Sequence, residues 1–374
     1  MDFGKTQISF SEERAMLLDA AQGLCADLSP IDKVRSLLED DIGYDETAWQ
    51  QMVEMGWTGL ALPESVGGSD FGLGALVPLF ECMGKRLLTT PLMSTVLAAE
   101  CLRRTGDPAA VTSLEQIAAG AKATVAFVEA DDWGSQHLTT RIEDGKLQGS
   151  KRHVADAADA TIFVIPAMRE GVKVLAIVRG DQIDTACRTK HDVLDATRRA
   201  QSITLDIAEA DITVIASNAE KALEETQLIG ALLVAAESTG AAVSCLNVTV
   251  DYLKTRKQFG RLIGSYQALK HPSVDILCAI ESSKSLIYQA ATELNADALS
   301  RDARIACHMA KSKASETLVF AGDRAVQFHG GMGFTYECDA QLYLRRGLWA
   351  QQAFGDPMHH RKRLAQLILD DEQV

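Results

Sequence analysis

The spacing of apolar residues along the chain predicts helices in its first third. One stretch repeats apolar residues at the intervals of a single helix face, at Leu17, Ala21, Leu24, Cys25 and Leu28. Helical spacing recurs over residues 49–55 and 76–102, and Thr90-Pro91 interrupts the second stretch because a residue before proline avoids the helical conformation. Residues 1–119 are therefore predicted to form an N-terminal helical domain.

The pattern changes near residue 120. Short runs rich in β-branched residues follow one another at 123–128, 138–142, 161–165, 172–178 and 203–207, separated by glycine and charged turns. Asp144-Gly145 between two such runs is typical of a tight hairpin. Residues 120–216 are therefore predicted to form a middle β-domain, a barrel or a sandwich.

From about residue 217 the spacing is helical again. One long helix is predicted over 219–255 and ends before Gly260–Gly264, a second over 271–299 and a third over 302–329. Pro272 is expected in the first turn of the second helix, where a missing N–H costs nothing. Residues 217–374 are predicted to form a C-terminal helical bundle, so the fold class is α+β, with helices, then strands, then helices.

Net charge and cysteine content limit the classes of binding partner and the compartment that we expect for this protein. The 374 residues include 37 Lys+Arg and 51 Asp+Glu, a formal net charge of −14, which argues against nucleic acid and against an anionic membrane surface. Apolar runs such as 228–236 are shorter than the ~20 residues that a bilayer helix requires. The 8 cysteines form no CxxC pair, so we expect reduced thiols, no metal site and a cytoplasmic protein.

A first candidate site follows the long predicted helix. Arg256, Lys257 and Arg261 cluster around Gly260, where a ligand can approach the backbone. A guanidinium at such a position can hold a diphosphate through paired hydrogen bonds. A solvated basic helix end followed by an ordinary glycine turn is the alternative interpretation.

A second candidate site follows the third predicted helix. Gly330, Gly331 and Gly333 come shortly after Gln327 and His329. Such a loop can turn its amides toward an anion. A helix C-cap and turn would use the same residues.

Together with Gly56-Trp57-Thr58-Gly59-Leu60 and Pro63-Glu64, these motifs resemble the acyl-CoA dehydrogenase family over nearly the whole chain. Members are flavoproteins that desaturate acyl-CoA thioesters between Cα and Cβ. The resemblance implies that the C-terminal domain contacts FAD held mainly by a neighbouring subunit, so that the cofactor is shared across an interface. The matching cofactor-binding positions are Arg256, Gln258 and Phe259 at the diphosphate, Gln327, Gly330 and Gly331 at the adenosine end, and Gln267 within the same signature.

Two segments of the middle domain depart from the family pattern. The loop that normally binds the isoalloxazine corresponds here to residues 128–136, and it contains two additional carboxylates, Asp131 and Asp132. Negative charge there would oppose the charge that a flavin gains on reduction. The second segment, 152–158, has neither the family's tryptophan nor its hydroxyl. The resemblance therefore predicts that this chain lacks a complete flavin site of its own.

The family's catalytic glutamate is also missing. Members carry it at one of two positions, which correspond here to Phe354, counted from Gln327, and to Gly230, counted back from Gly260. Proton abstraction from Cα requires a carboxylate or a comparable base. The nearby carboxylates are Asp356, Glu337 and, on the long predicted helix, Glu237. Asp356 is the first candidate for a substitute; a role for Asp356 in capping the segment before His359 is the structural alternative.

Two further motifs, Gly355-Asp356-Pro357-x-His359-x-Arg361 and Leu194-Asp195-x-Thr197-Arg198, resemble partner subunits of bacterial heteromeric acyl-CoA dehydrogenases that act on sterol or bile-acid side chains. This resemblance implies a heterotetramer in which a related subunit carries the catalytic Glu and an electron-transfer flavoprotein accepts the electrons. A self-sufficient homo-oligomer using Asp356 or Glu337 as base and a non-enzymatic scaffold are the alternatives. The isolated histidines 137, 153, 191 and 308 are expected in surface or packing roles.

Overall fold

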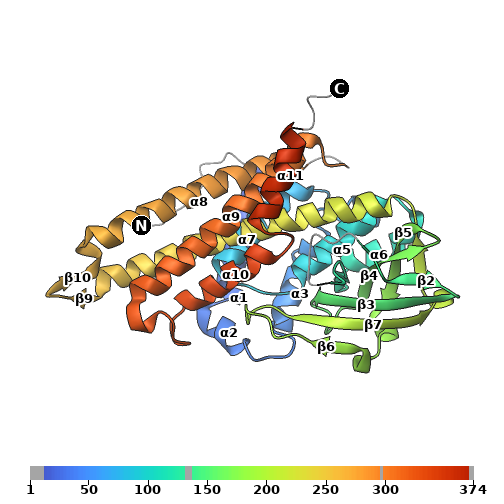
Figure 1. The fold of residues 1–374 in the computed structure, drawn as a ribbon, viewed down its shortest axis with the longest axis horizontal. Helices are drawn as coiled ribbons and strands as arrows, with labels where there is room; N and C mark the ends of the chain where they lie inside the picture. The colour runs from blue at the N-terminus through green and yellow to red at the C-terminus, as the bar shows by residue number, and fades with distance from the viewer. Residues whose placement is uncertain (1–11, 131–136, 295–297, 370–374) are drawn as a thin grey trace.

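The computed structural model describes residues 12–130, 137–294 and 298–369 (Figure 1). Helices are followed by strands and then by helices, which confirms the predicted α+β fold class. The last helix before the sheet ends at Ala118, and the first helix after it begins at Ala219.

The N-terminal part is helical. Its helices are α1 (Glu12–Leu28), α2 (Ile31–Ser36), α3 (Glu46–Glu54), α4 (Leu76–Lys85), α5 (Leu92–Thr105) and α6 (Val111–Ala118). Helix α3 begins after Asp45, whose side chain accepts a hydrogen bond from the amide of Thr47. The interruption predicted at Thr90-Pro91 is confirmed, because α5 begins directly after Pro91.

In the residues that the structure describes, the middle part is an eight-stranded mixed sheet with the order β6-β7-β3-β2-β4-β5-β8, and β1 pairs in parallel with β4. The strands are β1 (Ala123–Val125), β2 (Arg141–Glu143), β3 (Lys146–Ala155), β4 (Ile162–Arg169), β5 (Val172–Arg179), β6 (Arg188–Lys190), β7 (Ala200–Ala208) and β8 (Thr213–Ile215). The predicted hairpin is confirmed: Asp144 and Gly145, with φ of 52° and 72°, join β2 to β3.

The C-terminal part contains α7 (Ala219–Thr255), α8 (Gln267–Glu293), α9 (Arg301–His329), α10 (Ala340–Gln352) and α11 (Pro357–Leu369), with a short hairpin of β9 (Lys257–Gln258) and β10 (Arg261–Leu262) between α7 and α8. The three long predicted helices are confirmed, but the second, α8, both begins and ends earlier than the predicted range of 271–299. The expected place of Pro272 is wrong: α8 begins at Gln267, so Pro272 lies beyond the first turn and removes one intrahelical hydrogen bond.

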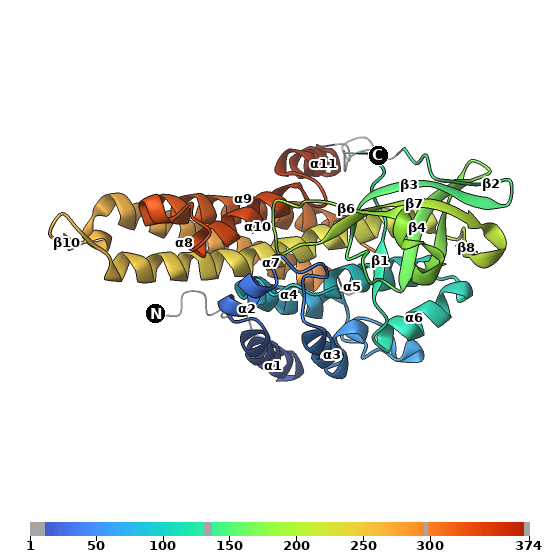
Figure 2. The same cartoon turned by 90° about the horizontal axis from the view of Figure 1, so that it is seen from below.

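Helix α7 is the central helix of the molecule. It lies between the N-terminal helices and the layer of α8, α9 and α10 (Figure 2). A Cβ on Gly240 would lie 1.9 Å from the carbonyl oxygen of Glu81 in α4, so glycine permits direct backbone contact between the two helices. Helix α7 is long and apolar enough to cross a membrane, but 94% of its most apolar window is buried inside the protein. It is therefore a core helix.

Candidate functional site

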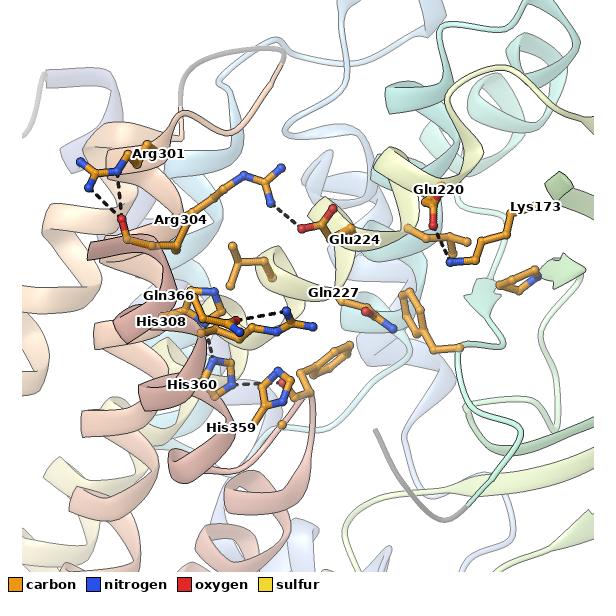
Figure 3. A pocket seen from close by; sticks show the side chains of 18 of the residues that line it. Lys173, Glu220, Glu224, Gln227, Arg301, Arg304, His308, His359, His360 and Gln366 are labelled. Carbon is orange, nitrogen blue, oxygen red and sulfur yellow. Dashed lines mark hydrogen bonds and ion pairs between the residues drawn. The ribbon is translucent and has the colours of Figure 1, made fainter. Parts of the chain in front are cut away.

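A cavity of about 660 Å³ lies where the sheet meets the helical bundle (Figure 3). Strands β4 and β5, the first turns of α7 and α9, the loop between α10 and α11, and α11 itself contribute to its wall. Apolar side chains line one part of the wall: Phe127, Leu138, Pro166, Leu223, Leu228 and Phe354. Polar and basic ones line another: Arg301, Arg304, His308, His359, His360 and Arg363. The volume is in the range of small-molecule and cofactor sites, roughly 300–1,000 Å³.

Phe354 and Gly230 meet at the apolar part of this cavity. Phe354 lines the cavity, and a Cβ built on Gly230 would lie 2.7 Å from its Cε1 atom. The ring of Phe127 packs edge-on against Phe354, with 5.8 Å between the ring centroids. The two positions at which the family carries its base therefore lie side by side, and neither has a carboxylate.

The carboxylates on the described cavity wall are engaged in ion pairs. Glu220 pairs with Lys173 at 2.6 Å, and Glu224 pairs with Arg304 at 2.8 Å. Asp356 is absent from the described lining; its Oδ1 accepts a hydrogen bond of 2.7 Å from the amide of His359 and so caps α11. This contact is the capping role that is the structural alternative to catalysis by Asp356.

The other carboxylates near the family's base positions are placed differently. Glu337 is exposed in the segment between α9 and α10. Glu237 is buried on α7, where Arg346 and Arg198 donate hydrogen bonds to it. In the described structure neither of these glutamates is part of the cavity wall.

Two buried side chains hold the loop that carries Phe354. Lys311 donates a hydrogen bond of 2.8 Å to the carbonyl oxygen of Gly355. Burial lowers the pKa of Lys311 to about 7, although Asp356 opposes the shift. His360 contacts the carbonyl oxygen of Phe354 at 3.1 Å, and its other ring nitrogen faces His308 at 2.8 Å.

A buried charge network contains the motif Leu194-Asp195-x-Thr197-Arg198. Arg346 of α10 donates hydrogen bonds to Asp195, to Thr197 and to Glu237 of α7. Arg198 also pairs with Glu237. Burial acts to raise the pKa of Asp195, but the two neighbouring guanidiniums hold it below its usual value. The network therefore fastens the middle domain to α7 and α10.

The same network borders one of the two segments that the resemblance assigns to the flavin. Burial raises the pKa of Asp156 to about 6. A hydrogen bond of 2.6 Å donated by Ser94 and the nearby guanidinium of Arg198 oppose this shift without cancelling it. The same guanidinium lies over the ring of Trp349, 4.4 Å from its centroid. His153, with a φ of 51°, packs against His191 at 4.6 Å.

The other flavin segment is only partly described. Asp131 and Asp132 lie outside the described residues. Glu129, just before them, forms an ion pair of 2.5 Å with the buried Lys151 and accepts hydrogen bonds from Thr139. These contacts tie the beginning of the segment to the strand region that follows it.

The two glycine motifs lie together at the end of the bundle farthest from the sheet (Figure 1). The ring of Tyr252, on the last turn of α7, stacks on His329 at the end of α9 with 4.2 Å between centroids. Added Cβ atoms on Gly330 and Gly331 would meet nothing within 4 Å. The polar candidates at this end are exposed: Arg256, Gln258, Gln267 and Gln327. Exposed donors around open glycine backbone fit the diphosphate and adenosine of FAD.

Phe259 is the most unusual residue of this end. It occupies the first turn position of the β9–β10 hairpin with a φ of 53°, and the residue is 88% exposed. A bulky residue in the left-handed region is strained, and such strain is concentrated at functional sites. The described cavity wall includes none of the predicted cofactor residues.

Models of two domains of one family match the chain. The acyl-CoA dehydrogenase N-terminal domain matches residues 11–121, and the acyl-CoA dehydrogenase C-terminal domain matches residues 221–369. A curated relative described as an acyl-CoA dehydrogenase is 32% identical over nearly its full length. The chain therefore belongs to the acyl-CoA dehydrogenase family, a class of FAD-dependent oxidoreductases, as the motifs predicted.

That relative is IpdE2 of Mycolicibacterium smegmatis, and the match covers 95% of this chain and 98% of the relative. IpdE2 of Mycobacterium tuberculosis is 28% identical, and the match covers 94% of this chain and 96% of the relative. Among solved structures, a chain of the Tcur3481-Tcur3483 steroid ACAD variant has a TM-score of 0.85 at 25% identity. The match covers 97% of this chain and 99% of the solved chain. A chain of the ChsE4-ChsE5 complex from Mycobacterium tuberculosis has a TM-score of 0.83 at 22% identity, with 98% of each chain covered.

Sequence reasoning missed the groups that surround the Phe354 loop. His308 is isolated in the sequence, but the fold pairs it with His360, which lies two helices later in the chain. Lys311 follows His308 by about one turn of α9 and reaches Gly355. A histidine and a lysine at helical spacing were the available signal, but their partners are brought close only by the fold.

Proposed function

We propose that this chain is the FAD-contributing, base-lacking subunit of a heterotetrameric acyl-CoA dehydrogenase. The reaction is α,β-desaturation of an acyl-CoA thioester to a 2-enoyl-CoA in the cytoplasm, and a related subunit supplies the catalytic Glu. The observation that carries the proposal is the pairing of Gly230 with Phe354, because one aromatic ring occupies the region where either family base would stand.

Names of similar proteins support the assembly and the substrate class. The solved structure with the TM-score of 0.85 is described as a steroid acyl-CoA dehydrogenase with two named components. We infer the same kind of assembly for this chain and a steroid side chain as its acyl group. An apolar wall beside a basic rim, as in the present cavity, suits a thioester with an apolar acyl group and a phosphorylated carrier.

The residues of the two glycine motifs have distinct roles in this proposal. Bound FAD would supply the hydride acceptor for Cβ, and a glutamate of the partner subunit would remove the proton from Cα. Arg256, Gln258 and Phe259 would contact the diphosphate of the cofactor held by the neighbour. Gln327, Gly330 and Gly331 would contact its adenosine end, and Tyr252 stacked on His329 would hold the two motifs in register. An electron-transfer flavoprotein would accept the electrons from the reduced cofactor.

The test is an absorbance spectrum in the flavin bands, recorded on the chain alone and on the chain co-expressed with a related acyl-CoA dehydrogenase subunit encoded beside it. The proposal expects a single chain without flavin and a yellow, active complex with about one flavin for each pair of different subunits. A yellow and active single chain would contradict the proposal and favour a self-sufficient enzyme.

A further inference from the structure

Two histidines on the cavity wall form a short chain of hydrogen bonds that ends on the backbone. Nδ1 of His308, on α9, lies 2.8 Å from Nδ1 of His360, on α11. Nε2 of His360 lies 3.1 Å from the carbonyl oxygen of Phe354. Both histidines line the cavity, and Figure 3 shows the dashed contact between their rings.

The backbone end of this chain determines the position of each proton. A carbonyl oxygen can only accept, so Nε2 of His360 carries a hydrogen. In a neutral imidazole the other nitrogen is then an acceptor, so Nδ1 of His308 must be the donor. Nε2 of His308 is left without a hydrogen, and no partner for it is found among the described residues.

The surroundings keep both rings neutral. Burial, assisted by His359, Arg363 and Arg304, lowers the pKa of His308 to about 4. Burial and the neighbouring Lys311 lower the pKa of His360 to about 2. A histidine that resists protonation is a poor general base at neutral pH. It is a good fixed acceptor, because a neutral nitrogen costs less to desolvate than a charged group.

We propose that His308 Nε2 is a ligand-recognition site, which accepts a hydrogen bond from an O–H or N–H donor of an acyl-CoA bound in this cavity. The apolar wall formed by Phe127, Leu223 and Phe354 contacts the apolar part of the acyl group. The donor is a hydroxyl on the acyl group or an amide of the pantetheine arm. The inference takes its ligand class from the proposed function but does not depend on which subunit carries the base.

The experiment measures binding without turnover, so its failure is distinguishable from failure of the proposed desaturation. The full chain, in the complex with its partner, is titrated calorimetrically with its flavin reduced beforehand. The probes are cyclohexanecarboxyl-CoA and its 3-hydroxy and 4-hydroxy derivatives. His308→Phe removes the acceptor, His308→Gln retains one in a carboxamide oxygen, and Met309→Leu, at a 37% exposed neighbour, is the matched control.

An acyl-hydroxyl donor predicts that His308→Phe weakens a hydroxylated probe about tenfold more than the parent probe. A pantetheine donor predicts that His308→Phe weakens all three probes about tenfold, while His308→Gln restores them. Either result supports the proposal. Equal weakening by both His308 variants, unchanged affinities in His308→Phe, or no binding by the wild-type complex would overturn it.

Discussion

Phe354 occupies the space that a side chain at position 230 would need. A Cβ on Gly230 would lie 2.7 Å from Cε1 and 2.8 Å from Cζ of the Phe354 ring. One residue belongs to α7 and the other to the loop between α10 and α11, so two distant parts of the chain share one volume. A side chain can therefore occupy one of the two positions only if the other position is small.

The first prediction tests this shared volume. Gly230→Ala should lower the free energy of unfolding by about 1–3 kcal/mol, because a new methyl group is forced against a packed ring. In a Phe354→Ala background the same substitution should cost less than about 0.5 kcal/mol, a coupling that urea denaturation of the double-mutant cycle measures.

Gly23→Ala is the matched control. Gly23 lies in helix α1, and an added Cβ would meet nothing within 4 Å. This substitution should stabilise the protein by up to about 1 kcal/mol, because alanine is the better helix former. Equal effects at positions 23 and 230 would show that Phe354 does not restrict the second site.

The second prediction concerns Asp356. Asp356→Asn should leave turnover of the complex unchanged, because asparagine caps a helix as well as aspartate does. Asp356→Ala should lower stability by about 1 kcal/mol through loss of the bond to the amide of His359. Steady-state assays and thermal melts of both variants check this, with the exposed Glu337→Gln as companion. A large loss of turnover in Asp356→Asn or in Glu337→Gln would instead identify a base.

The third prediction concerns the cofactor end of the bundle. Arg256→Ala should reduce the flavin bound per complex severalfold, because a charge-assisted contact to a diphosphate is lost. Lys254→Ala, an exposed neighbour on the last turn of α7, is the control and should retain the flavin. Flavin released by acid and measured by absorbance gives the ratio. Undiminished flavin in Arg256→Ala would support the scaffold interpretation.

The fourth prediction concerns the buried network. Arg346→Met should lower the free energy of unfolding by about 3–5 kcal/mol, because Asp195 and Glu237 lose a shared buried guanidinium. The control is Arg179→Met, which breaks a pair whose side chains are 70% and 72% exposed and should change stability by about 0.5 kcal/mol or less. Chemical denaturation compares them, and a small effect of Arg346→Met would mean that water or other groups compensate both carboxylates.

The fifth prediction is a pH dependence. Burial raises the pKa of Asp156 to about 6 in the folded protein, above its ordinary value of 3.8. Between these values the folded state binds more protons than the unfolded state, so stability should fall as pH rises from about 4 to about 6. The total change is about 3 kcal/mol for this group.

Asp156→Asn removes this contribution because an amide does not ionise. The variant should be more stable than the wild type at pH 7.5 and similar to it near pH 4, provided that the amide oxygen accepts from Ser94. Asp192→Asn, at an exposed aspartate, is the control. Denaturation curves from pH 4 to 8 measure the difference, and parallel curves for wild type and Asp156→Asn would contradict the prediction.

The local pattern of apolar residues was sufficient to predict most of the helices and strands. The apolar spacing predicted α7 and α9 closely, because long helices repeat the same signal over many turns. Strands β6 and β8 were missed because each contains only 3 residues. The partner of β8 is β5, from which β6 and β7 separate it in the chain. The start of α8 was misplaced because proline suggested a first turn, whereas Tyr266 accepts the first backbone bonds of the helix.

The family and the absence of a glutamate at positions 230 and 354 can be read from the residues alone, because both depend on residue identity at fixed spacing. That these two positions share one volume, and that His308 meets His360, follows from the folded arrangement of the helices. The same holds for Arg346, which joins Asp195 to Glu237. These contacts join residues far apart in the chain, and packing between helices determines which of them meet.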